Sequence, residues 1–228
     1  MQKVNVYPGP YHWYLGRFYK CKYERAAELA KKFLKKSFVA LDVGCGDGRM
    51  EELLAPSVKK IIGVDYQERP LEFARLLVTH KNVKFIRNDK KLPVHDNSID
   101  AVVCFDVIEH ISINAVNSFV KEIKRVLRKN GIFIVTTPNR KELRGRFFGH
   151  KIDPKHYQEF IIPELQELLE KNGFRVDYTT GIFVPVPIPF IEHFANIYPI
   201  YWIFAFLVKL GRAFPQIAET MFIAARKN

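Results

Sequence analysis

The chain has 228 residues, of which 48% are hydrophobic, and a formal net charge of +12 at pH 7. This length buries one sizeable core, so we expect a single domain, and the absence of repeats and low-complexity tracts excludes a repeat architecture. The positive charge is compatible with a nucleic-acid partner, an anionic membrane surface or a lysine-rich soluble surface, and it does not distinguish these three possibilities.

The three cysteines, Cys21, Cys45 and Cys104, have neither paired nor metal-type spacing. This pattern predicts no disulfide framework and no metal site. The first fourteen residues mix Pro, Gly, His and aromatic residues, where a secretory signal would have a basic stretch and then an apolar one. We therefore expect a reduced, cytoplasmic protein.

The first predicted element is a helix over Tyr23–Lys36, whose apolar residues recur at helical spacing between charges. Short apolar runs then alternate with helical stretches as far as Pro138. Alternation of this kind predicts a doubly wound parallel sheet that is covered on both faces. The expected strands are Val39–Val43, Ile61–Val64, Val83–Ile86, Ile99–Phe105 and Ile132–Thr136, and the expected helices are Arg49–Leu54, Arg69–Thr79 and Ala115–Arg128, the last ended by Asn130-Gly131.

Beyond Pro138 we expect a helix over Glu164–Glu170 and two last strands, Phe174–Val184 and Glu219–Ala225. The segment 185–215 between these strands is rich in proline and aromatic residues and is predicted to be an insertion. Its charge-free stretch Phe194–Val208 would span about 22 Å as a helix, which is less than the roughly 30 Å of a bilayer core. Three roles stay open for the insertion: a lid over a hydrophobic substrate, a peripheral membrane contact and a dimer surface.

A glycine loop follows the first strand, with Gly44 and Gly46 at alternate positions. Such a loop lets backbone N–H groups approach a ligand at a helix N-terminus. Arg49 stands where a dinucleotide-binding loop has its third glycine, so a smaller ligand is favoured. Asp65 ends the second strand about twenty residues later and is placed to bind both hydroxyls of a ribose, or else to cap the next helix. Asp42 is expected to shape the loop.

This pattern resembles the class I S-adenosylmethionine-dependent methyltransferase family, in particular its small-molecule and quinone-type group. The resemblance implies an α/β, Rossmann-like, doubly wound fold: a mostly parallel seven-stranded sheet with helices on both faces and an antiparallel last strand. Residues 1–228 would form one methyltransferase domain, with an N-terminal aromatic segment and helix (1–37), a cofactor-binding core (38–139) and the insertion (185–215) as substrate lid. The motifs are Leu41–Gly48, Gly63–Tyr66, Asn88-Asp89 with Leu92-Pro93, Ile99–His110 and Leu127–Ile132.

The resemblance also implies S-adenosyl-L-methionine as the cofactor. Its methionine part would lie along Gly44 to Gly46, with Phe105 covering that side near the sulfonium. Its ribose would lie on Asp65, and its adenine beside Tyr66 and Asp89. At Lys90, which follows Asp89, the sequence departs from the small or acidic residues of the family. The cofactor-binding residues that it implies are Asp42, Gly44, Cys45, Gly46, Asp65, Tyr66, Asp89, Lys90 and Phe105.

Methyl transfer from a sulfonium is an in-line displacement with an activated leaving group, so a catalytic base is optional. A hydroxyl acceptor would benefit from one, and histidine has a suitable pKa. His110 follows the fourth strand at the sheet edge where ligands bind and is the candidate base, the alternative being that it only begins the next helix. His156 and Tyr157 are candidates for substrate binding or for packing of a loop.

The favoured function is a methyltransferase with a small, hydrophobic acceptor. The main alternative is an RNA methyltransferase, motivated by the charge of +12 and by basic pairs such as Lys31-Lys32. A non-catalytic binding protein is a third class. The chain lacks the Asn-Pro-Pro-aromatic run and the Pro-Cys pair that two nucleic-acid chemistries need after the fourth strand. The acceptor atom and the oligomeric state stay open.

Overall fold

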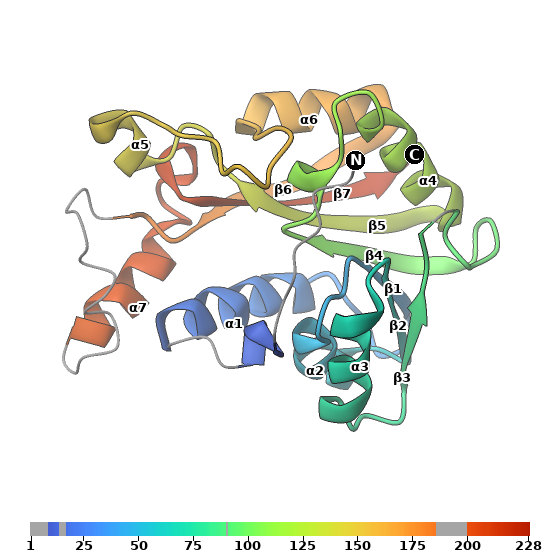
Figure 1. Ribbon diagram of the computed structural model, residues 1–228. Helices are drawn as coiled ribbons and strands as arrows, with labels where there is room; N and C mark the ends of the chain where they lie inside the picture. The colour runs from blue at the N-terminus through green and yellow to red at the C-terminus, as the bar shows by residue number, and fades with distance from the viewer. Residues whose placement is uncertain (1–8, 14–16, 90, 186–199) are drawn as a thin grey trace.

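A computed structural model describes residues 9–13, 17–89, 91–185 and 200–228. Its centre is a seven-stranded sheet with the strand order β3-β2-β1-β4-β5-β7-β6 (Figure 1). Strands β1 to β5 run parallel to one another, and β7 lies between β5 and β6 and is antiparallel to both. The predicted Rossmann-like sheet is therefore confirmed. The strands are β1 Val39–Val43, β2 Lys60–Asp65, β3 Val83–Arg87, β4 Ile99–Phe105, β5 Leu127–Pro138, β6 Phe174–Ile182 and β7 Thr220–Lys227.

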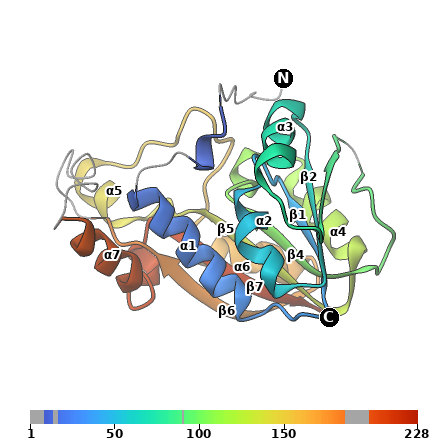
Figure 2. The ribbon, with the colours of Figure 1, turned by 90° about the horizontal axis from the view of Figure 1, so that it is seen from below.

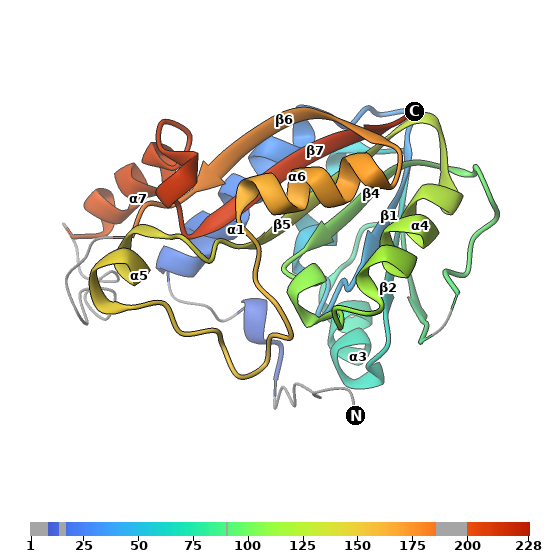
Figure 3. The same ribbon diagram turned by 90° about the horizontal axis from the view of Figure 1, so that it is seen from above.

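Helices cover both faces of the sheet. Figure 2 shows the face with α1, α2 and α3, and Figure 3 shows the opposite face with α4 and α6. Each face has its own core of buried aliphatic side chains, because central strands of a parallel sheet send alternate residues to either side. The helices are α1 Arg17–Lys31, α2 Arg49–Leu54, α3 Glu68–Leu77, α4 Val116–Val126, α5 Leu143–Phe148, α6 Ile162–Lys171 and α7 Ile200–Leu210, with 3-10 turns η1 Tyr11–Trp13, η2 Ala55–Ser57, η3 Ile108–His110 and η5 Pro215–Ile217.

The predicted end of the fourth helix was wrong. Helix α4 ends at Val126, and the residues that follow already belong to β5, where Leu127 pairs with Ile99 of β4. Leu127 is fully buried against the sheet, so burial and strand pairing override the Asn130-Gly131 stop signal. Asn130 has the positive φ typical of such a signal, 60°, but adopts it inside the strand.

The predicted insertion lies between β6 and β7. Its residues 186–199 are outside the described part of the chain, and α7 occupies the stretch that follows them. Val208 of α7 is buried in the same core as α1, whereas Trp202, Ile203 and Phe206 are exposed. Within the described ranges no helix has both the length and the apolar character needed to cross a bilayer.

The arrangement of the strands determines where a ligand binds. Strands β1 and β4 are neighbours, and the chain moves outward from them in opposite directions, β1 to β2 and β4 to β5. Between two such strands the following loops diverge and leave a crevice at the carboxyl edge of the sheet. The glycine loop follows β1, Asp65 ends β2, and the segment around His110 follows β4, so all three lie at this edge.

Candidate active site

The glycine loop joins β1 to α2 in a conformation that only glycine adopts freely. Gly44 has φ of 80°, and a Cβ there would lie 2.4 Å from the side chain of Val107. The amides of Gly44 and Cys45 both donate to the carbonyl of Val64, at 2.8 and 3.1 Å. The loop is thus tied to the end of β2 on one side and packed on the segment after β4 on the other.

Asp65 lies at the end of β2, beside the glycine loop. Its carboxylate accepts hydrogen bonds from the amide of Gly46, at 3.0 Å, and from the amide of Gln67, at 2.8 Å. Burial raises the pKa of Asp65, and these two hydrogen bonds partly offset that effect. A carboxylate has about four acceptor positions, so two remain for the hydroxyls of a ribose. The local capping role and the ribose role are therefore compatible.

A pair of buried acids, Asp42 and Glu51, lies beneath the loop. Burial raises the pKa of Asp42 to about 7, and burial followed by the charge of Asp42 raises the pKa of Glu51 well above its usual range. Among the described residues, Oδ2 of Asp42 and both oxygens of Glu51 are buried without a hydrogen-bond partner. A bound proton or a cationic ligand group is the natural partner for such a pair, and the methionine ammonium of S-adenosylmethionine fits this requirement.

We expect Asp42→Asn to make the protein more stable than the wild type above pH 7. A carboxyl whose pKa is raised by folding stabilises the folded state fully at pH values below its unfolded pKa, near 3.8. This stabilisation is lost as the pH rises through the folded pKa of about 7. The loss amounts to at most about 4 kcal/mol for a shift of this size. Urea unfolding from pH 4 to 9 measures it.

The matched control for this prediction is Glu28→Gln, on the exposed surface of α1. We expect its unfolding free energy to follow the wild-type pH dependence. The Asn variant is also expected to bind S-adenosylmethionine more weakly, because it lacks the charge that would face the ammonium. Identical pH profiles for the Asn variant and the wild type would contradict the assignment of the shifted pKa to Asp42.

The other predicted cofactor residues lie around the same edge. Tyr66 follows Asp65, and burial followed by the charge of Asp65 raises the pKa of its phenol. Phe105 ends β4 and is buried, and the thiol of Cys45 is buried too, which leaves Cys45 to act through its backbone. Asp89 is exposed in the bend after β3. Lys90 lies outside the described residues.

His110 lies in η3, which follows the carboxyl end of β4. Two residues after β4, Val107 contacts Gly44, so this segment lies directly against the cofactor loop. Just before it, Asp106 has φ of 53°, an uncommon conformation that persists because its amide and carboxylate both bond to Thr136 of β5. Burial lowers the pKa of His110, so its imidazole is neutral at pH 7 and able to accept a proton.

The structure brings His156 to His110. The loop between α5 and α6 returns to η3, where the amide of Tyr157 donates to the carbonyl of Glu109 at 2.9 Å, and the two imidazole rings meet edge to face with centroids 4.9 Å apart. Tyr157 also lies close enough to Tyr66 for its charge to affect that phenol's pKa. The predicted substrate residues thus lie beside both the candidate base and the cofactor edge.

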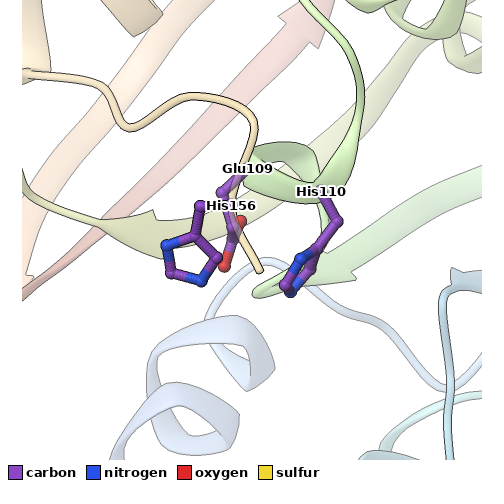
Figure 4. Close-up of side chains that lie close together, drawn as sticks. All are labelled: Glu109, His110 and His156. Atoms are coloured by element: carbon purple, nitrogen blue, oxygen red, sulfur yellow. The ribbon is translucent and has the colours of Figure 1, made fainter. Parts of the chain in front are cut away.

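Two acids complete this cluster, and sequence reasoning missed both. Glu109 is buried, accepts from the hydroxyl of Thr137 at 2.9 Å, and faces the two histidines (Figure 4). Burial followed by the charge of Asp106 raises its pKa well above the usual range. Glu159 is buried between His156 and His150, at 2.6 Å from each. Burial opposes its ionisation, but the hydrogen bond from His156 and the nearby histidines leave its pKa lowered overall.

The N-terminal segment is fastened onto the glycine loop through Asp47. The amide and Nδ1 of His12 lie 2.8 and 2.9 Å from the carboxylate of Asp47, and the indole of Trp13 donates to its carbonyl at 2.9 Å. The guanidinium of Arg49 lies 5.3 Å from the Trp13 ring. Sequence reasoning noted the aromatic segment but not Asp47, because only the fold brings residues 12 and 47 together.

We expect Asp47→Ala to speed the dissociation of S-adenosylmethionine about tenfold. The substitution removes both hydrogen bonds to His12, each worth about 1 kcal/mol, and so releases a segment that covers the loop. Stopped-flow displacement of the cofactor measures the rate. Asp96→Ala, an exposed acid far from the loop, is the control. An unchanged rate would show that the contact is only structural.

A pocket of about 480 Å³ opens next to the histidine cluster, at the carboxyl end of β5. Its lining includes Asn139 just after β5, Phe148 of α5, and both His150 and Glu159. Glu159 therefore faces this pocket on one side and holds His156 on the other. The pocket reaches the histidine cluster only through Glu159, because neither His110 nor His156 is among its lining residues.

Comparison with known proteins agrees with this geometry. Residues 41–135 match the family model described as a methyltransferase domain. A probable S-adenosylmethionine-dependent methyltransferase of Mycolicibacterium smegmatis is 40% identical over 144 residues, which are 63% of this chain and 54% of that protein. A ubiquinone biosynthesis O-methyltransferase of Pelagibacter ubique is 25% identical over 166 residues, which cover 64% of this chain and 65% of that protein.

Among solved structures, an S-adenosylmethionine-dependent methyltransferase from Aquifex aeolicus superposes with a TM-score of 0.63 at 18% identity, covering 92% of this chain and 93% of that one. This likeness shows the fold. The chain spans about half the length of the Mycolicibacterium relative. The domain match, the glycine loop with Asp65 and the sheet order agree: the chain carries a methyltransferase domain over residues 41–135 and is similar to class I S-adenosylmethionine-dependent methyltransferases.

Proposed function

We propose that this protein transfers a methyl group from S-adenosylmethionine to a hydroxyl group of a small, hydrophobic acceptor. The observation that carries the proposal is the position of His110 and His156, which lie side by side at the carboxyl edge of the sheet, in and beside the segment whose Val107 packs on Gly44 of the glycine loop. When bound, the cofactor supplies an activated methyl group on a sulfonium.

The residues on the cofactor side would hold the cofactor and orient it. Asp65 would bind the ribose, and the buried acid Asp42 would face the ammonium group. Tyr66 and Phe105 offer aromatic surface at the ends of β2 and β4. Positioning of this kind accounts for a large share of the acceleration in a displacement whose leaving group is already activated.

The histidines give the reason to favour a hydroxyl. An alcohol or phenol becomes a good nucleophile only when it loses its proton, so a neutral imidazole beside it is useful. Because burial lowers the pKa of His110, the ring is in its base form at neutral pH. His110 is therefore the proposed catalytic base, with His156 and Tyr157 orienting the acceptor. The ubiquinone-pathway relative, which is an O-methyltransferase by name, supports this choice.

Exposed aromatic side chains favour a hydrophobic acceptor. Phe147 and Phe148 of α5 and Trp202 and Phe206 of α7 are between 56% and 65% exposed. Helices α5 and α7 lie at the same end of the molecule, beyond β5 and β6 (Figures 1 and 3). We propose that this end receives the apolar part of the acceptor, with α7 belonging to a lid. A membrane contact and a dimer surface are the competing roles for the same side chains.

The test supplies radiolabelled S-adenosylmethionine together with a lipid extract or with total RNA. Label is expected in the lipid fraction, in a compound small enough to migrate ahead of phospholipids. Label in RNA alone would overturn the choice of acceptor and favour the nucleic-acid alternative. Calorimetric titration with the cofactor comes first, because a chain that does not bind it would not be an enzyme of this class.

A further inference from the structure

Glu109, His110 and His156 form a cluster whose side chains point toward one another. Each of them offers one ligand atom, and these atoms all lie within 4.8 Å of one another. Figure 4 shows Glu109 and His110 coming from η3 and His156 coming from the loop before α6. The chemistry of this set, two imidazoles and a carboxylate, is that of a metal site.

Hydrogen bonds hold both imidazole rings in the orientation that ligation needs. Nδ1 of His110 lies 3.1 Å from the carbonyl oxygen of Lys155, and Nδ1 of His156 lies 2.6 Å from Oε1 of Glu159. Both partners are acceptors, so Nδ1 is the protonated nitrogen in each neutral ring. Nε2 of each ring is left with its lone pair. Metal-binding histidines use this arrangement, a backbone carbonyl or a carboxylate behind the ring.

Glu109 supplies the negative charge. One of its oxygens, Oε2, accepts from Thr137 at 2.9 Å, which fixes the carboxylate, and the side chain is only 1% exposed. A buried carboxylate beside two imidazole rings needs a nearby positive charge to stay ionised. A divalent ion would provide that charge.

We infer that Glu109, His110 and His156 bind a divalent transition-metal ion of the zinc class. Imidazole ligands favour such ions over Mg²⁺ and Ca²⁺, which prefer oxygen ligands throughout. Bonds of about 2.1 Å place tetrahedral ligand atoms about 3.4 Å apart, so the loop that carries His156 moves inward by no more than about 1.4 Å when the ion binds. Three protein ligands leave a coordination position open.

The open position would take the acceptor hydroxyl, a role that rests on the proposed function. An oxygen bound to such an ion loses its proton near neutral pH, and water carries that proton away. The oxygen then forms a bond to the methyl carbon, the carbon–sulfur bond breaks, and its electron pair stays on sulfur, which becomes a neutral thioether. No oxidant or reductant is needed. With the ion present, Nε2 of His110 binds the ion and no longer accepts the proton of the acceptor hydroxyl. The bound ion then generates the alkoxide in place of the imidazole ring.

The test uses the full chain without an affinity tag, treated with a chelator and then titrated with Zn²⁺ by calorimetry. We expect one ion per chain. His156→Ala and His110→Ala should each weaken binding at least about 100-fold. Glu159→Gln, which weakens the orienting bond to His156 and leaves the three ligands in place, should weaken it about 10- to 100-fold. His95→Ala, an exposed histidine elsewhere, should bind as the wild type does.

Co²⁺ gives a second readout that does not depend on activity. Visible absorption bands typical of four- or five-coordinate Co²⁺ are expected for the wild type and for His95→Ala, and are expected to be lost in His156→Ala. The thermal melting of each variant shows that it is folded. Equal Zn²⁺ affinity in the wild type and His156→Ala would overturn the site, as would binding that depends on His95.

The same samples separate this inference from the proposed function. Chelator-treated protein that transfers methyl groups at the full rate and binds no Zn²⁺ would overturn the metal site and leave the methyltransferase intact. Protein that binds Zn²⁺ through the three side chains but never binds S-adenosylmethionine would establish the site and remove the proposed function.

Discussion

Asp65→Ala is expected to raise the dissociation constant for S-adenosylmethionine at least about 100-fold. Two hydrogen bonds between ribose hydroxyls and an ionised carboxylate contribute about 1.5 kcal/mol or more each, and the variant loses both. Calorimetric titration measures the effect with the cofactor and with its demethylated product. Both ligands should be affected equally, because they share the ribose.

Loss of Asp65 also removes the acceptor for the amides of Gly46 and Gln67, so the glycine loop itself could loosen. Asp65→Asn separates the two effects: it keeps an oxygen in place for the loop, and its affinity should fall about tenfold, between the wild type and the alanine variant. Asp177→Ala, in the distant strand β6, is the control for loss of a strand carboxylate. Wild-type affinity in the alanine variant would mean that Asp65 only caps α3.

His110→Ala is expected to lower kcat by about 10² to 10⁴, the usual contribution of a positioned base. The affinity for S-adenosylmethionine should stay within about twofold, since the imidazole is assigned to the acceptor. Burial lowers the pKa of His110 below 6.5, so the neutral base form prevails at pH 7. The wild-type rate should therefore be level from pH 7 upward and should fall as the pH drops below 6.5. Initial rates from pH 5 to 9 measure both effects.

The rates are compared for chelator-treated protein with and without added Zn²⁺, because proton transfer and metal binding use the same nitrogen of His110. His95→Ala should retain the wild-type rate and pH profile. A His110→Ala protein with unaltered kcat would remove this residue from the chemistry, and proximity alone would then account for turnover.

Much of the fold follows from local sequence patterns. Buried parallel strands are continuous apolar runs, and β1 and β4 begin and end at the predicted residues. The glycine loop and Asp65 were also recognisable in the sequence, because the loop follows one strand directly and Asp65 ends the next. They lie close together in the fold because neighbouring parallel strands end at the same edge of the sheet. The division into a core over 38–139 and a lid over 185–215 stays a prediction.

The histidine cluster could not be derived in this way. Glu109 and His110 adjoin in sequence, but His156 is 46 positions further on, and its place depends on how the α5–α6 loop hydrogen-bonds to η3. Spacing arguments for metal ligands rely on short motifs, and here the cysteine spacing only predicted that no metal site exists. Asp47 escaped notice for the same reason, since its partner His12 is 35 positions away.

The sequence by itself determined the sheet, the cofactor loop and the resemblance to the methyltransferase family, because these depend on residues that are close together along the chain. The tertiary structure decided what surrounds the reacting group: a buried Glu109, two rings held by Lys155 and Glu159, and an N-terminal segment bound to the loop. Long-range contacts of this kind arise only when the loops beyond the strands pack together. Single side chains at that edge leave no periodic pattern from which they could be predicted.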